Sequence, residues 1–164
     1  MRILGVDPGL RVTGYGLLEI KEGQPFLAEA GVVRVASPAP LEVRLASLYD
    51  GLKEILEEHR PQIVAIEEVY SKYGQVSVGL KMGHARGALF LAAAKSGVPV
   101  VSYSATRVKK SLTGNGRASK EQVQRMVKAE LNLAGLPHPA DVADALAVAL
   151  CHYQTLAYQR NDDL

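Results

Sequence analysis

Three apolar segments open the chain, and turn-forming residues separate them. Residues 2–7, 14–20 and 26–35 are rich in apolar side chains, with Pro or Gly residues at their boundaries. Apolar runs of this length between turn residues are typical of β-strands. Because only a short turn separates the first two segments, we expect a hairpin, and the third segment extends it to a three-stranded antiparallel start.

The pattern then changes to alternating helices and strands. Apolar residues recur at helical spacing from Leu41 to Ile55, which predicts a helix that ends at Arg60-Pro61. The apolar runs 62–67 and 98–103 predict two more strands, the second of them buried on both faces as in a parallel sheet. Further helices are predicted over 76–96, 105–111, 119–131 and 139–158.

This order of elements predicts the α/β class. We expect a mixed five-stranded sheet, with three antiparallel strands followed by two parallel ones, flanked by helices. No linker-like segment divides the chain, so we expect one domain over residues 1–158 and a flexible tail over residues 159–164.

Composition narrows the class of protein. With 164 residues, 48% of them hydrophobic and 22% charged, the chain is typical of a globular protein that builds its core without disulfides. The single cysteine, Cys151, forms no intrachain disulfide and has no zinc-ligand spacing around it. The N-terminus reaches Asp7 too soon for a signal peptide, and the longest apolar run, 88–94, is far shorter than the ~20 residues of a membrane span. We therefore expect a cytoplasmic protein.

The net charge of +2 conceals an uneven distribution. Between Lys72 and Lys128 the chain has eleven Lys and Arg residues against one acid, Glu121, whereas the remainder is acidic overall. A basic middle third favours a polyanionic partner such as nucleic acid. A solvated basic face without a partner would give the same count.

Four acids stand at the predicted ends of strands or at the start of a helix. Asp7 and Glu67 end two apolar strands, and Asp141 and Asp144 are spaced to share one face of the last helix. Four converging carboxylates would repel one another unless divalent cations neutralised them, and oxygen-only ligands favour Mg²⁺ or Mn²⁺ over zinc. Two such ions can activate a water and stabilise the leaving oxygen of a phosphodiester. The pattern thus indicates metal-dependent phosphoryl transfer to water.

Each of these acids also has a simpler interpretation. Asp7 precedes Pro8-Gly9 and would also suit a turn, and Glu67 would also suit a solvated strand end beside Glu68. Asp141 and Asp144 would also suit the positive end of a helix dipole without binding anything.

Four segments that contain these acids match a known pattern: Ile3-Leu4-Gly5-Val6-Asp7-Pro8-Gly9 with Val12-Thr13-Gly14-Tyr15-Gly16, then Ala65-Ile66-Glu67, then Ala85-Arg86-Gly87, and finally Ala140-Asp141-Val142-Ala143-Asp144-Ala145-Leu146-Ala147. In this order and at this spacing they resemble the RuvC family of bacterial Holliday-junction resolvases. The resemblance implies an RNase H-like fold and a homodimer that cuts a four-way DNA junction by two symmetric nicks. These nicks would serve recombination and DNA repair and leave 5′-phosphate and 3′-hydroxyl ends. The resemblance also implies that RuvA and RuvB are partner proteins.

The resemblance assigns roles to single residues. Asp7, Glu67, Asp141 and Asp144 correspond to the family's catalytic, metal-binding acids, so we expect two Mg²⁺ ions per site, with Mn²⁺ able to substitute. Lys109 and Lys120 correspond to DNA-contacting lysines, although Lys120 would also suit a solvated first helical turn. Tyr70 corresponds to an aromatic residue that stacks on unpaired bases at the crossover, with a core position as its alternative.

Three glycines recur every fourth residue on one predicted helix, at Gly79, Gly83 and Gly87. Glycine in a helix costs about 1 kcal/mol relative to alanine, so a close backbone approach is the expected compensation. The glycine face either packs on the protein's own sheet or forms the two-fold contact of a dimer. Because the family's dimer helix lies in this segment, we expect the dimer contact.

Other functions fit parts of the pattern. A relative of the YqgF type would share the fold but act on RNA, and a non-catalytic protein would bind the junction without cutting it. Actin-like and sugar-kinase ATPases open with a similar turn, but they need two such domains. The complete set of four acids favours the DNA resolvase.

Overall fold

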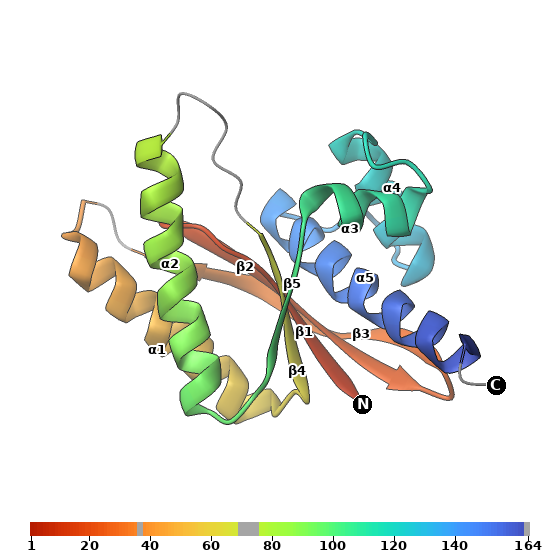
Figure 1. Cartoon of the computed structure of the whole chain (residues 1–164), viewed down its shortest axis with the longest axis horizontal. Helices are drawn as coiled ribbons and strands as arrows, with labels where there is room; N and C mark the ends of the chain where they lie inside the picture. The colour runs from red at the N-terminus through yellow and green to blue at the C-terminus, as the bar shows by residue number, and fades with distance from the viewer. Residues whose placement is uncertain (36–37, 69–75, 163–164) are drawn as a thin grey trace.

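The computed structural model describes residues 1–35, 38–68 and 76–162. A twisted sheet crosses the middle of the molecule, with α1 and α2 on one side and α5, covered by α3 and α4, on the other (Figure 1). The strands are β1 (Arg2–Asp7), β2 (Val12–Lys21), β3 (Gln24–Arg34), β4 (Ile63–Glu67) and β5 (Val100–Tyr103). The helices are α1 (Leu41–His59), α2 (Val76–Lys95), α3 (Ala105–Thr113), α4 (Lys120–Glu130) and α5 (Ala140–Asp162).

The sheet has the strand order β3-β2-β1-β4-β5. Strands β1, β2 and β3 pair antiparallel, whereas β4 pairs parallel to both β1 and β5. The prediction of a mixed sheet, with three antiparallel strands followed by two parallel ones, is therefore confirmed.

Two elements differ from their predicted form. Strand β5 was expected to be buried on both faces from residue 98 onwards, but it begins at Val100 and is mostly half-buried. It lies at the edge of the sheet, next to β4 alone, so its outer side has no neighbouring strand. Helix α5 extends to Asp162, so residues 159–162 continue the helix where we expected a tail.

Alternate residues of β1 point to opposite faces and so enter two separate cores. Leu4 and Val6 pack with side chains of α1 and α2, among them Leu48 and Leu89. Ile3 packs on the other face, in the core that α5, α3 and α4 cover. The central strands are thus held from both sides.

Helix α5 lies directly on the backbone of β1 and β2. A Cβ atom at Gly5 would collide with the carbonyl oxygen of Ala145, and one at Gly14 would collide with the carbonyl oxygen of Asp141. Glycine is required at both positions because no side chain fits between strand and helix. This close approach brings the first turn of α5 against the end of β1.

Among the described residues, no helix combines the length and the apolar character needed to cross a membrane.

Candidate active site

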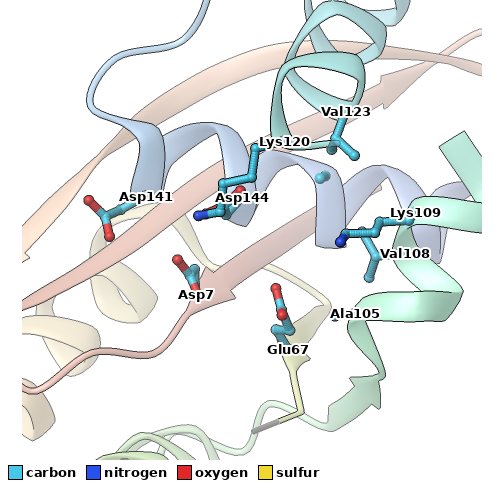
Figure 2. Close-up of a pocket in the computed structure, with 10 residues that line it drawn as sticks. Asp7, Glu67, Ala105, Val108, Lys109, Lys120, Val123, Asp141 and Asp144 are labelled. Carbon is cyan, nitrogen blue, oxygen red and sulfur yellow. The ribbon is translucent and has the colours of Figure 1, made fainter. Parts of the chain in front are cut away.

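All four predicted acids line one pocket of about 270 Å³ at an end of the sheet. Figure 2 shows Asp7 at the tip of β1, Glu67 at the tip of β4, and Asp141 and Asp144 on α5. Lys109 from α3 and Lys120 from α4 also line this pocket. Residues far apart in the sequence are therefore brought together here.

The sheet places Asp7 and Glu67 side by side. Strands β1 and β4 are parallel, with Val6 opposite Ile66, so both strands end at the same edge. Each acid is the last residue of its strand, which directs the chain out of the core at that point. Both side chains are half-buried, with one side open to the pocket.

The helix supplies the other two acids. Asp141 and Asp144 lie in the first turns of α5 and are both half-buried. The contact of Gly14 with the backbone of Asp141 fixes this end of α5 against the sheet. The separation of these acids from Asp7 therefore depends on backbone packing more than on flexible side chains.

The carboxylates perturb one another. Burial, together with the negative charges of Glu67, Asp144 and Asp141, raises the pKa of Asp7 to about 8. Burial and the nearby Asp144 also raise the pKa of Glu67. Such shifts mark a place where negative charge accumulates without enough compensation, which is typical of a cation-binding or catalytic site.

Lys120 supplies part of the compensation. Its Nζ atom lies 3.0 Å from Oδ2 of Asp144, and this hydrogen-bonded contact raises the pKa of Lys120. Lys120 begins α4, whose N-terminus is held by a capping box between Ser119 and Gln122. Lys120 was expected to face either solvent or a DNA phosphate. The structure shows that it also contacts a carboxylate of the pocket.

Lys109 approaches the pocket from α3. This helix starts at the N-cap Ser104, whose side chain accepts a hydrogen bond from the backbone N–H of Arg107, and it ends at Gly114 with φ 75°. Its positive charge acts on Glu67, where it lowers the pKa against the effect of burial. Lys120 lowers the same pKa, so both lysines act on Glu67, and Lys120 is also hydrogen-bonded to Asp144.

The chemistry of the donor set fits a hard divalent cation. All four acids offer carboxylate oxygens, the ligands that Mg²⁺ and Mn²⁺ prefer. Across the described ranges, no three acidic, His or Cys side chains are close enough to form a ready-made metal cluster. Binding of a cation by three of these acids would therefore draw their carboxylates closer together, and Asp144 would bind it through Oδ1 or exchange its contact with Lys120.

The remaining predicted residues lie elsewhere. Tyr70 falls outside the described residues. Gly79, Gly83 and Gly87 are on α2, away from the pocket. A Cβ atom at Gly83 or Gly87 would meet no atom within 4 Å, so at these two positions the glycine face does not pack on the protein's own sheet.

Sequence reasoning missed one polar contact behind the pocket. The hydroxyl of Tyr103, the last residue of β5, lies 2.7 Å from Nδ1 of His152 on α5, and both side chains are buried. His152 follows Asp144 by two helical turns, but nothing in the sequence marks Tyr103 as its partner.

Comparisons with known proteins agree with this geometry. The sequence model of the family described as "Crossover junction endodeoxyribonuclease RuvC" matches residues 3–152. A protein of that name from Rhodopirellula baltica is 48% identical, over 92% of this chain and 85% of its own length.

Solved structures give the same result. The structure of Thermus thermophilus RuvC has a TM-score of 0.89 and 35% identity, over 97% of each chain. The same protein in complex with a Holliday junction substrate has a TM-score of 0.87 and 33% identity, over 96% of each chain. These matches confirm the RNase H-like fold. The chain belongs to the RuvC family of crossover junction endodeoxyribonucleases.

Proposed function

We propose that the protein resolves four-way DNA junctions by cutting two opposed strands, each at a pocket formed by Asp7, Glu67, Asp141 and Asp144. The observation that carries this function is the convergence of four carboxylates and two lysines in one pocket of a RuvC-family chain. In each cut, water attacks the phosphorus atom and the bond to the 3′ oxygen breaks. The products are a 5′-phosphate and a 3′-hydroxyl.

The four acids hold divalent cations in this proposal, with Mg²⁺ as the expected ion. Such ions supply the positive charge that water activation and departure of the 3′ oxygen require. Asp7 has the central position, because the other three acids all act on its pKa. Burial and the neighbouring acids favour the protonated form of its carboxyl group, and a bound divalent cation would favour the ionised form.

The two lysines contact the DNA phosphates. Lys109 is half-buried at the wall of the pocket, and Lys120 is exposed at the start of α4. Lys120 pairs with Asp144. A metal ion held by Asp144 would weaken this pair and leave Lys120 available to a phosphate.

We further propose that α2 forms the contact between two copies of the chain. One face of this helix is apolar and faces solvent: Val76, Leu80 and Leu91 are 62%, 64% and 54% exposed. Gly83 and Gly87 lie on the same face, at helical spacing, with open space in front of them. The opposite face, which includes Ala85 and Leu89, is buried in the protein's own core.

A two-fold dimer suits the substrate. A four-way junction has two opposed scissile strands, and two identical pockets on a symmetric body can reach both. Open glycines let two helices approach closely, and the flanking apolar side chains then leave water. The partner proteins RuvA and RuvB remain a prediction from the family, and action in the cytoplasm remains a prediction from the sequence.

The test is a nicking assay on a synthetic four-way DNA junction with a mobile core, in Mg²⁺, Mn²⁺ or EDTA. We expect paired, symmetric cuts that need the metal ion and are confined to the junction. Linear duplex and an RNA–DNA hybrid serve as control substrates. Junction binding without cutting would favour a non-catalytic binder, and cutting of the hybrid or of RNA would favour the YqgF-type alternative.

A further inference from the structure

The four acids of the pocket belong to two parts of the structure. Asp7 is tied to α5 because β1 and β2 pack on the backbone of that helix at Gly5 and Gly14. Glu67 is the last residue of β4, one strand further from β2. The pairing of β4 with β1 places Glu67 beside Asp7, and a contact between β5 and α5 would tie Glu67 to Asp144 by a second route.

The backbone of Tyr103 pairs with the end of β4. It lies opposite Glu67 in the register of β4 and β5. Its carbonyl oxygen accepts a hydrogen bond from the backbone N–H of Glu68, at 2.9 Å. Tyr103 therefore anchors the chain immediately after Glu67.

The side chain of Tyr103 contacts α5. It is 3% exposed, and its hydroxyl lies 2.7 Å from Nδ1 of His152, which is 5% exposed on α5. Burial lowers the pKa of His152 and so favours the neutral ring, in which Nδ1 accepts the hydroxyl hydrogen when Nε2 carries the ring proton. In the described structure, Nε2 of the same ring is buried without a hydrogen-bond partner. A neutral His152 that loses Tyr103 would therefore keep two unpaired polar atoms in the core.

Neighbouring groups hold the tyrosine ring in place. The guanidinium of Arg107 lies over the ring, 4.9 Å from its centre. Arg107 belongs to α3, the helix that also carries Lys109. A phenylalanine at position 103 would keep these ring contacts and lose the hydroxyl alone.

We propose that Tyr103 and His152 are positioning residues for the carboxylate pocket. Their hydrogen bond fixes the distance between Glu67, at the end of β4, and Asp144, two turns earlier on α5. Neither side chain is among those that line the pocket, so both act through the acids that they hold in place. This inference rests on the metal-dependent function proposed above.

The experiment compares Tyr103→Phe with Tyr153→Phe. Tyr153 lies on α5 beside His152, and its hydroxyl donates a hydrogen bond to the carbonyl oxygen of Gly23 in the β2–β3 turn. Its loss removes a tyrosine hydrogen bond of the same length, 2.7 Å, that is exposed and remote from the pocket. Two quantities are measured: binding of Mn²⁺ to the DNA-free protein, from the electron paramagnetic resonance signal of the free ion, and the Mg²⁺ concentration that gives half-maximal cleavage.

We expect Tyr103→Phe to weaken Mn²⁺ binding and to raise the half-maximal Mg²⁺ concentration several-fold, with unchanged junction affinity in EDTA. Tyr153→Phe should leave both metal measurements within twofold of the unmodified protein. His152→Leu should behave like Tyr103→Phe. In His152→Asn the amide can accept a hydrogen bond from the tyrosine hydroxyl, so both metal measurements should stay close to those of the unmodified protein.

Equal metal requirements for Tyr103→Phe and Tyr153→Phe would overturn the positioning role, whatever their melting temperatures. Failure of the proposed function gives a different result, because the unmodified protein would then neither bind Mn²⁺ nor cut a junction. A loss of melting temperature that is equal in the two variants, with a metal defect in Tyr103→Phe alone, would support the proposal.

Discussion

The burial of Asp7 is the feature of single residues that most affects the site. Its carboxyl group lies among three other acids, and its pKa is about 8 instead of 3.8. Between these two pH values the folded chain holds a proton that the unfolded chain has released. Stability therefore falls as pH rises through this interval, by up to about 1.4 kcal/mol per pH unit, and levels off above pH 8.

Asp7→Asn removes this dependence, because the amide is neutral at every pH and resembles the protonated acid in shape. We expect the variant to gain melting temperature over the unmodified protein as pH rises from about 5 to 9, measured in EDTA. Cleavage should fall to background while junction binding stays nearly intact. The assigned role would be contradicted if the two proteins differed in melting temperature by the same amount at every pH in this range, or if the variant still nicked junctions in Mg²⁺.

The ammonium group of Lys120 is a second single-residue feature that affects the site. It lies 3.0 Å from Asp144 and also acts on Asp7 and Glu67, so it competes with a divalent cation for the same carboxylates. We expect Lys120→Met to bind Mn²⁺ a few-fold more tightly in the absence of DNA, since an exposed ion pair contributes at most about 1 kcal/mol. Lys109→Met is the matched control, because Lys109 acts on Glu67 alone among the acids with shifted pKa values. An equal gain in both variants would indicate a general charge effect instead of competition at Asp144.

At the scale of elements, local patterns were enough to predict most strands and helices. Asp7 and Glu67 could be placed at strand ends from the apolar runs before them. The edge position of β5 could not, because an apolar run does not show whether a strand has one neighbour or two. The pairs Lys120–Asp144 and Tyr103–His152 join residues 24 and 49 positions apart, and only the packing of helices on the sheet brings them together.

The contact of α5 with the sheet gives a prediction for Gly14. A Cβ atom there would collide with the backbone of Asp141, so Gly14→Ala must push the start of α5 away from β2. We expect a loss of about 1–3 kcal/mol in the free energy of unfolding and a large loss of cleavage. Gly135→Ala is the control, because a Cβ atom at Gly135 would meet nothing within 4 Å. Chemical denaturation and the nicking assay measure the two effects, and equal behaviour of the two variants would contradict the packing argument.

At the scale of the whole molecule, the pocket and the proposed dimer contact lie on different elements. The pocket is formed by β1, β4 and α5 with α3 and α4, whereas the apolar face is on α2. Changes on α2 can therefore separate assembly from the chemistry of each pocket.

Leu80→Glu places a charge on the apolar face, at its most exposed leucine, where a dimer would bury it. We expect a monomer in analytical ultracentrifugation that nicks junctions without pairing the two cuts. Val78→Glu is the control, because Val78 is 54% exposed but lies on the other side of α2 by helical spacing. A Leu80→Glu variant that still sediments as a dimer would exclude this face as the contact.

The exposed apolar face of α2 also links heat stability to the amount of protein present. If a second copy covers this face in the folded state, association favours folding by mass action. The melting temperature should then rise with protein concentration in the unmodified protein and stay constant in Leu80→Glu. A resolvase at low copy number would thus lose paired cutting and thermal stability together on dilution.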